Sequence, residues 1–151
     1  MASVRVMIAD DYDAMRTALA GALRSEPGIE VVGEARDGYS AVLLAQKLKP
    51  DLVLMDVNMP GLDGIEATRR IVQRDPDVKV IGLSVHCFAF YARQMLDAGA
   101  HAYFLKDGDI EDLLEAIEAV CRGQTYVSSE VVGLGCRSSR PRMPRRFSHV
   151  G

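Results

Sequence analysis

The 151-residue sequence has few cysteines and no long hydrophobic run, and both shortages restrict what it can be. No apolar stretch is long enough to cross a bilayer, so we expect no association with a membrane. The three cysteines, Cys87, Cys121 and Cys136, lack the paired spacing of metal or redox sites. Cys121 falls on the apolar face of a predicted helix, where we expect it to be buried as a small hydrophobic residue.

An export signal is also lacking, and the basic residues are unevenly distributed along the chain. The chain enters a predicted strand at Val4 without the basic segment and apolar core of a signal peptide, which favours a cytoplasmic location. Of the 18 basic residues, five arginines lie within residues 137–149, which contain no acid, so 13 basic residues stand against 21 acidic ones elsewhere. Such an acidic surface does not suit a phosphate backbone.

Short apolar runs alternate with segments whose apolar residues repeat every three or four positions. The runs cover residues 4–9, 29–35, 52–55, 78–84 and 102–105. The predicted helices begin near Asp13, Gly38, Gly64, Ala89 and Asp109, and we expect Asp13 to cap the first of them. Unbroken apolar runs indicate strands buried on both faces, as in a parallel sheet. The alternation predicts an α/β, doubly wound, five-stranded parallel sheet of the flavodoxin-like order 2-1-3-4-5, with helices on both faces.

The pattern also predicts where the domain ends. Helical or strand periodicity fails beyond Val132, and the remaining residues are rich in Gly, Ser, Pro and Arg. We therefore expect one domain over residues 1–127 and a disordered tail, rich in Arg, Pro and Ser, over residues 128–151.

Two of the predicted strands end in acids. The first leads into Asp10 and Asp11, and the central one leads into Asp56. In the order 2-1-3-4-5 these strands are neighbours at the switch point of the sheet, where ligands bind beyond the carboxyl ends. Each pair of like charges 4 Å apart costs on the order of 4 kcal/mol at an effective dielectric near 20, so a divalent cation such as Mg²⁺ is expected. The alternative is that Asp10 and Asp56 only cap helices.

Two further strands end in functional groups, Ser84 and Lys106. Taken singly, Lys106 would be an ordinary surface lysine and Ser84 a turn residue. Beside a nucleophilic carboxylate, however, a hydroxyl and an ammonium group are what phosphoryl transfer to an aspartate needs. The combination therefore favours a phosphoryl-transfer site at this edge of the sheet.

These residues together resemble the receiver domain of two-component response regulators. The likeness extends roughly over residues 4–125 and rests on Asp10-Asp11, Asp56, Met59-Pro60-Gly61-Leu62-Asp63-Gly64, Ser84 and Lys106. It implies that Asp56 accepts a phosphoryl group from a histidine kinase or a phosphotransfer protein. It also implies that Mg²⁺ is held by Asp10, Asp11, Asp56 and the backbone carbonyl of Asn58.

The resemblance assigns further roles. Ser84 would hydrogen-bond a phosphoryl oxygen, and Lys106 would form an ion pair with the charged site. Tyr103 resembles the aromatic residue that turns inward when the hydroxyl moves, so Ser84 and Tyr103 would form the switch. The alternative for Tyr103 is an ordinary core aromatic. The implied function is a phosphorylation-dependent switch, with slow hydrolysis of its own acyl phosphate at most, and a homodimer formed on phosphorylation is compatible with it.

Some details resemble the subgroup of regulators with a LuxR-type helix-turn-helix output domain. These are Gly82-Leu83-Ser84-Val85-His86, Leu105-Lys106-Asp107 and Tyr126-Val127-Ser128. The sequence departs from the subgroup because no second apolar-periodic segment follows Val132. We therefore expect either the regulatory half of a transcriptional regulator or a stand-alone receiver, and no specific DNA binding by this chain. Asp107 also stands where the family often has a proline.

Two other functions compete with the switch. An aspartyl-phosphate hydrolase would carry a second acid two residues after the nucleophile, whereas Asp56 is followed by Val57-Asn58. A flavin or small-molecule module on the same fold would place a Gly-rich phosphate loop after the first strand, and none is present.

Overall fold

The computed structural model describes residues 3–87, 89–128 and 131. Its strands are β1 (Val4–Ala9), β2 (Ile29–Ala35), β3 (Leu52–Asp56), β4 (Lys79–Ser84), β5 (Ala102–Leu105) and β6 (Tyr126–Val127). Its helices are α1 (Asp13–Arg24), α2 (Gly38–Leu48), α3 (Gly64–Arg74), α4 (Ala89–Asp97) and α5 (Ile110–Cys121). The parallel sheet has the order β2-β1-β3-β4-β5-β6. The predicted order 2-1-3-4-5 is confirmed, and the two-residue strand β6 is an addition at its edge.

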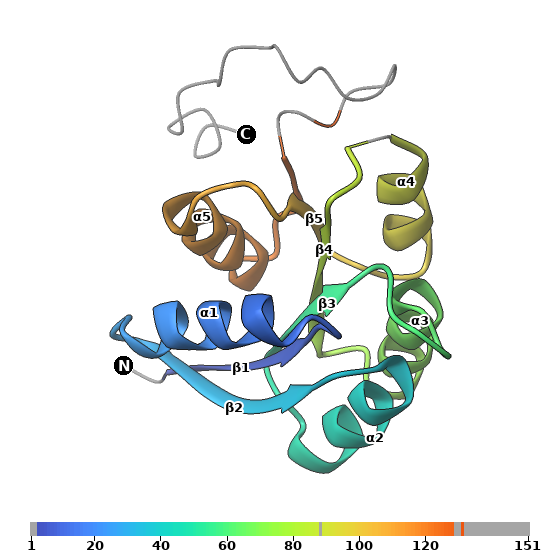
Figure 1. Ribbon diagram of the computed structural model, residues 1–151, viewed down its shortest axis with the longest axis horizontal. Helices are drawn as coiled ribbons and strands as arrows, with labels where there is room; N and C mark the ends of the chain where they lie inside the picture. The colour runs from blue at the N-terminus through green and yellow to red at the C-terminus, as the bar shows by residue number, and fades with distance from the viewer. Residues whose placement is uncertain (1–2, 88, 129–130, 132–151) are drawn as a thin grey trace.

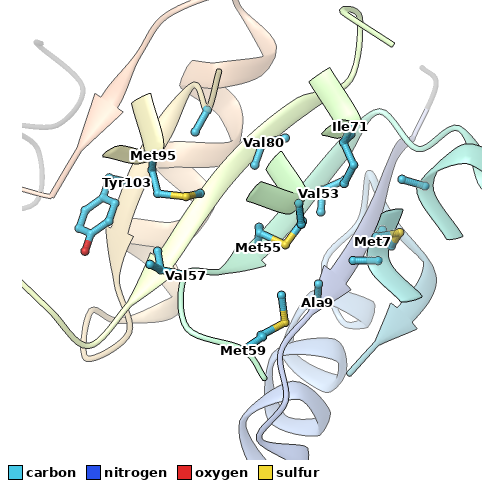
Figure 2. Packing of buried hydrophobic residues seen from close by; sticks show 14 of the residues in the cluster. Met7, Ala9, Val53, Met55, Val57, Met59, Ile71, Val80, Met95 and Tyr103 are labelled. Carbon is cyan, nitrogen blue, oxygen red and sulfur yellow. The ribbon is translucent and has the colours of Figure 1, made fainter. Parts of the chain in front are cut away.

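The helices cover both faces of the sheet (Figure 1). Because side chains alternate along a strand, β1 sends Val6 and Ile8 to one face and Met7 and Ala9 to the other. The first face packs against α1 and α5, and the second packs against α2, α3 and α4. Figure 2 shows part of the second core, including Met7, Ala9, Val53, Met55, Val80, Ile71 and Met95.

Helix starts differ in one respect from the sequence prediction. Asp37 and Asp63 cap α2 and α3, accepting hydrogen bonds from the backbone N–H groups of Ser40 and Glu66. Asp13, in contrast, was expected to cap α1 but is the first residue within the helix, and Tyr12 occupies the cap position. The Asp13 carboxylate accepts hydrogen bonds from arginine side chains instead.

The cysteine prediction is also wrong in one place. Cys121 is exposed, although Val120 beside it is fully buried. Successive helix residues are rotated by about 100°, so only one of two neighbouring apolar residues at the end of α5 faces the sheet.

Two glycines allow close backbone approaches next to the carboxyl ends of the strands. A Cβ atom on Gly64 would lie 1.9 Å from the carbonyl oxygen of Asp56, and one on Gly38 would lie 2.0 Å from that of Leu62. Neither position has room for a side chain. The loop between β3 and α3 is therefore held tightly against the starts of α2 and α3.

The last described residues are attached to β5. The N–H of Ser128 donates to the carbonyl of Tyr103, and the N–H of Leu105 donates to Ser128 Oγ. Ser128 is buried, so the expected domain boundary between residues 127 and 128 falls within this contact. The rest of the predicted tail lies outside the described residues, apart from Val131. Within the described part of the chain, no helix has the length and hydrophobicity needed to span a bilayer.

Candidate functional site

The strand register brings the ends of four strands to one edge of the sheet. Ala9 pairs with Met55, so Asp10 follows β1 beside Asp56 at the end of β3. Ser84 at the end of β4 pairs with Leu105, and the N–H of Lys106 donates to the Ser84 carbonyl over 2.8 Å. The four predicted strand-end groups therefore lie along one edge, as expected for parallel strands.

Asp56 is a buried carboxylate, with only 3% of its surface exposed. Its Oδ1 atom accepts a hydrogen bond from the N–H of Asn58 over 3.3 Å and lies 3.2 Å from Lys106 Nζ. Burial, opposed by Lys106 and assisted by the negative charge of Asp10, raises the pKa of Asp56 to about 7. Asp56 is thus poised between a protonated and an ionised form near neutral pH.

Asp10 is fully buried, and its polar groups are directed by several neighbours. Its N–H donates to the carbonyl of Ala35, and its Oδ1 accepts from the N–H of Tyr12 over 2.9 Å. Its Oδ2 lies 3.0 Å from Lys106 Nζ. That separation fits an ion pair, but Oδ2 accepts no hydrogen bond of suitable angle among the described residues, so it retains acceptor capacity.

Lys106 joins the two buried acids. Burial acts to lower the pKa of Lys106, but its interactions with the carboxylates of Asp10 and Asp56 outweigh this effect and raise the pKa. The ammonium group therefore stays charged at neutral pH. All described peptide bonds are trans, including the one between Lys106 and Asp107.

The acids at this edge fit a hard cation. One carboxylate oxygen from each of Asp10, Asp11 and Asp56 can be chosen so that all three lie within 4.8 Å of one another. Asp10 and Asp56 are buried, whereas Asp11 is exposed and opens the group to solvent. Mg²⁺ usually keeps several waters and binds a protein through only one or two carboxylates, so this group offers enough ligands for it. Oδ2 of Asp10, which is paired with Lys106 but accepts no hydrogen bond of suitable angle among the described residues, can also bind a cation.

Ser84 and Tyr103 are connected through the backbone of His86. The N–H of His86 donates to Ser84 Oγ over 2.9 Å, and the Tyr103 hydroxyl donates to the carbonyl of His86 over 2.6 Å. Tyr103 is fully buried, and its ring lies in the core beside Met95 (Figure 2). The His86 ring also stacks on Tyr91, with centroids 4.5 Å apart.

One residue near the site was missed by the sequence analysis. Arg16 donates a 2.7 Å hydrogen bond to the backbone carbonyl of Asp10. No spacing rule marks this contact, because its acceptor is a main-chain atom that every residue possesses. Only the placement of α1 against the end of β1 reveals it.

Solved structures share this fold. A LuxR-family two-component response regulator from Aurantimonas sp. SI85-9A1 is 35% identical, with a TM-score of 0.82, covering 86% of this chain and 93% of that one. The isolated REC domain of RcsB from Salmonella enterica serovar Typhimurium, solved with the phosphomimetic BeF₃⁻, is 26% identical. Its TM-score is 0.78, and the match covers 85% of this chain and 96% of the other.

Characterised regulators are similar in sequence. The transcriptional regulatory protein DegU of Brevibacillus brevis is 42% identical over 128 residues, which are 85% of this chain and 54% of DegU. The response regulator GacA of Pseudomonas aeruginosa is 38% identical over 139 residues, which are 91% of this chain and 65% of GacA. The chain thus spans between about half and two thirds of the length of these relatives. The response regulator receiver domain model matches residues 6–118, and the chain belongs to this family.

Proposed function

We propose that the chain is a phosphorylation-dependent switch of a two-component phosphorelay, with Asp56 as the phosphoryl acceptor. The observation that carries the proposal is the geometry around Asp56. A buried carboxylate lies 3.2 Å from a charged lysine, at the strand edge where two further acids meet. The membership of the receiver family supports the same role.

In the proposed reaction, a carboxylate oxygen of Asp56 attacks the phosphorus of a phosphohistidine on a histidine kinase or phosphotransfer protein. An O–P bond forms, the N–P bond breaks, and the histidine leaves with its electron pair and takes up a proton. Asp10, Asp11, Asp56 and the Asn58 carbonyl would hold Mg²⁺, which supplies charge neutralisation for the phosphoryl oxygens. Lys106 contributes a fixed positive charge beside the acceptor oxygen.

The switch itself would involve Ser84 and Tyr103. A phosphoryl group on Asp56 adds charge of roughly −1.5 to −2 and strong acceptor oxygens. The Ser84 hydroxyl can donate to such an oxygen while it accepts from the N–H of His86. Movement of Ser84 would then reach Tyr103 through the His86 peptide, and the face around α4 and β5 would change shape.

The downstream effect of the switch would depend on the partner that contacts the face around α4 and β5. DegU is described as a transcriptional regulator, and this chain spans 54% of its length. We propose that this chain supplies the regulatory part of such a regulator or acts as a stand-alone receiver. Its described residues form a receiver fold, and we propose that they do not read DNA sequence, because such reading needs an element that presents side chains to base edges. A homodimer formed on phosphorylation is consistent with the proposal.

The test is covalent labelling of Asp56. The full chain is incubated with Mg²⁺ and acetyl phosphate, and intact mass and peptide mapping follow the phosphoryl adduct. We expect one adduct on Asp56, its loss in Asp56→Asn, and its retention in the matched control Asp77→Asn, because Asp77 is exposed and precedes β4, at the end of that strand opposite to Ser84. An undiminished adduct in Asp56→Asn would overturn the assignment, and rapid turnover of phosphomonoesters would favour the hydrolase.

A further inference from the structure

The Arg16 side chain is nearly buried and contacts three segments. Its Nη1 donates to the carbonyl of Asp10 over 2.7 Å, its Nη2 to Asp13 over 2.7 Å, and its Nε to Glu34 over 3.2 Å. Only 12% of the side chain is exposed. The guanidinium thus ties the end of β1 to the first turn of α1 and to β2.

The three acceptors differ in what they provide. Asp13 and Glu34 supply negative charge, which compensates the cost of burying a guanidinium. The Asp10 carbonyl is neutral and balances no charge. Its peptide group, however, joins Asp10 to Asp11, so the hydrogen bond orients the peptide that carries both acids of this loop.

This orientation matters most for Asp11. Asp10 is buried and directed by Tyr12 and Lys106, whereas the Asp11 side chain is exposed. The direction in which the Asp11 side chain points from the loop therefore depends on the orientation of the Asp10–Asp11 peptide plane. A planar guanidinium can fix that peptide while it pairs with two carboxylates, which an ammonium group cannot match in geometry.

We propose that Arg16 is a positioning residue for the metal-binding loop, acting through the Asp10 carbonyl to set the carboxylates of Asp10 and Asp11. The inference rests on the proposed function, because it assumes that these acids hold Mg²⁺. Partners that orient metal ligands typically change metal affinity 10–100-fold when they are removed.

Arg24 provides a matched control on the same helix. Arg24 pairs with Glu34 over 3.4 Å, and Arg16 pairs with the same carboxylate over 3.2 Å. The Arg24 side chain, however, is 55% exposed. Among the described residues, the Arg24 side chain donates a hydrogen bond to Glu34 alone. Arg24→Gln therefore removes one positive charge and one contact with Glu34, and leaves the Asp10 carbonyl bonded.

The experiment measures Mg²⁺ dissociation constants by titration calorimetry on the full chain and its variants. Electrostatics alone predicts tighter Mg²⁺ binding when a nearby positive charge is removed. We instead expect Arg16→Gln to bind Mg²⁺ about 10-fold more weakly, with Arg24→Gln within about two-fold of the unaltered protein. Labelling of Asp56 in Arg16→Gln should recover at saturating Mg²⁺, which separates metal binding from the transfer step.

A second variant keeps the test decisive if Arg16→Gln does not fold. Arg16→Lys retains the charge and should also bind Mg²⁺ more weakly, since it cannot reproduce the three bonds. Melting in EDTA checks that each variant is folded. Unchanged Mg²⁺ affinity in the folded Arg16 variants, or equal weakening in Arg24→Gln, would overturn the inference while Asp56 labelling leaves the proposed function standing. Failure of the unaltered protein to bind Mg²⁺ and to label Asp56 would overturn both.

Discussion

The Tyr103 hydroxyl donates a 2.6 Å hydrogen bond to the backbone carbonyl of His86, two residues beyond Ser84. The N–H of the same residue donates to Ser84 Oγ, so one peptide segment lies between the buried aromatic and the strand-end hydroxyl. The two interpretations of Tyr103 offered by the sequence are therefore compatible. Its ring is part of the core, while its hydroxyl contacts the segment that Ser84 also contacts.

Removing the Tyr103 hydroxyl should destabilise the protein and make the segment after β4 open more often. We expect Tyr103→Phe to lower the free energy of unfolding by about 1 kcal/mol, since the His86 carbonyl loses its donor while the ring stays packed. Amide exchange of residues 84–87 should become faster in the variant. Urea unfolding and hydrogen exchange measure the two effects, with Tyr39→Phe as an exposed control. Identical exchange in Tyr103→Phe and the unaltered protein would show that this bond does not restrain the segment.

Magnesium should stabilise the fold through the acidic group. Binding to the native state alone raises stability by about 2.7 kcal/mol when Mg²⁺ is 100 times its dissociation constant. Asp11→Ala should abolish most of this gain, because it removes the exposed member of the three acids. Thermal melting over a Mg²⁺ series, with Asp77→Ala as control, makes the comparison. Equal stabilisation of Asp11→Ala would place the ion elsewhere.

The pKa of Asp56 gives stability a definite pH dependence. Burial raises that pKa from 3.8 to about 7, so the native protein keeps a proton that the unfolded chain releases. The stabilising contribution is fully present below about pH 4 and is lost as the pH rises through about 7. In EDTA, Asp56→Asn should therefore gain stability relative to the unaltered protein between these limits, by on the order of a few kcal/mol.

Urea unfolding of both proteins at several pH values between these limits measures the difference. Other titrating groups are present in both proteins, so their contributions to the pH dependence of stability cancel in the comparison. One example is Asp37, whose pKa is lowered by hydrogen bonds. Parallel stability profiles for the two proteins would mean that Asp56 does not hold a proton in the native state.

The approach of α3 to the end of β3 should be intolerant of a methyl group. A Cβ on Gly64 would fall 1.9 Å from the Asp56 carbonyl oxygen, so Gly64→Ala must displace backbone and should destabilise by several kcal/mol. Gly21 lies within α1, and a Cβ there meets nothing within 4 Å. Gly21→Ala should therefore stabilise by about 0.5–1 kcal/mol. Chemical unfolding compares the pair, and similar effects of the two substitutions would contradict the close approach.

The sequence predicted those features that depend on pattern. Buried parallel strands are continuous apolar runs, so the sequence predicts the positions of β1 and β3. The predicted strand order makes these two strands neighbours, and it therefore also predicts that Asp10 lies close to Asp56. Features that depend on one residue's rotation or on main-chain acceptors were missed. Asp13 lies one position inside α1. Cys121 is turned away from the core that holds Val120.

Strand β6 and Arg16 were missed for related reasons. A two-residue strand has too few side chains to show an alternation, and its pairing with β5 comes from the path of the chain after α5. The contact of Arg16 with the Asp10 carbonyl depends on the angle at which α1 leaves β1. Neither the length of an apolar run nor the spacing of polar residues contains that information.

Strand β6 also covers part of the outer edge of β5. It pairs along β5, and Ser128 Oγ accepts the N–H of Leu105. A chain cut at residue 125 would turn β5 into an outer strand with open donors and acceptors, and would remove the buried Tyr126 ring from the α5 side. Exposed strand edges of this kind recruit other chains by adding strands, which leads to aggregation. Any excised receiver intended for study in isolation therefore needs to extend through Ser128.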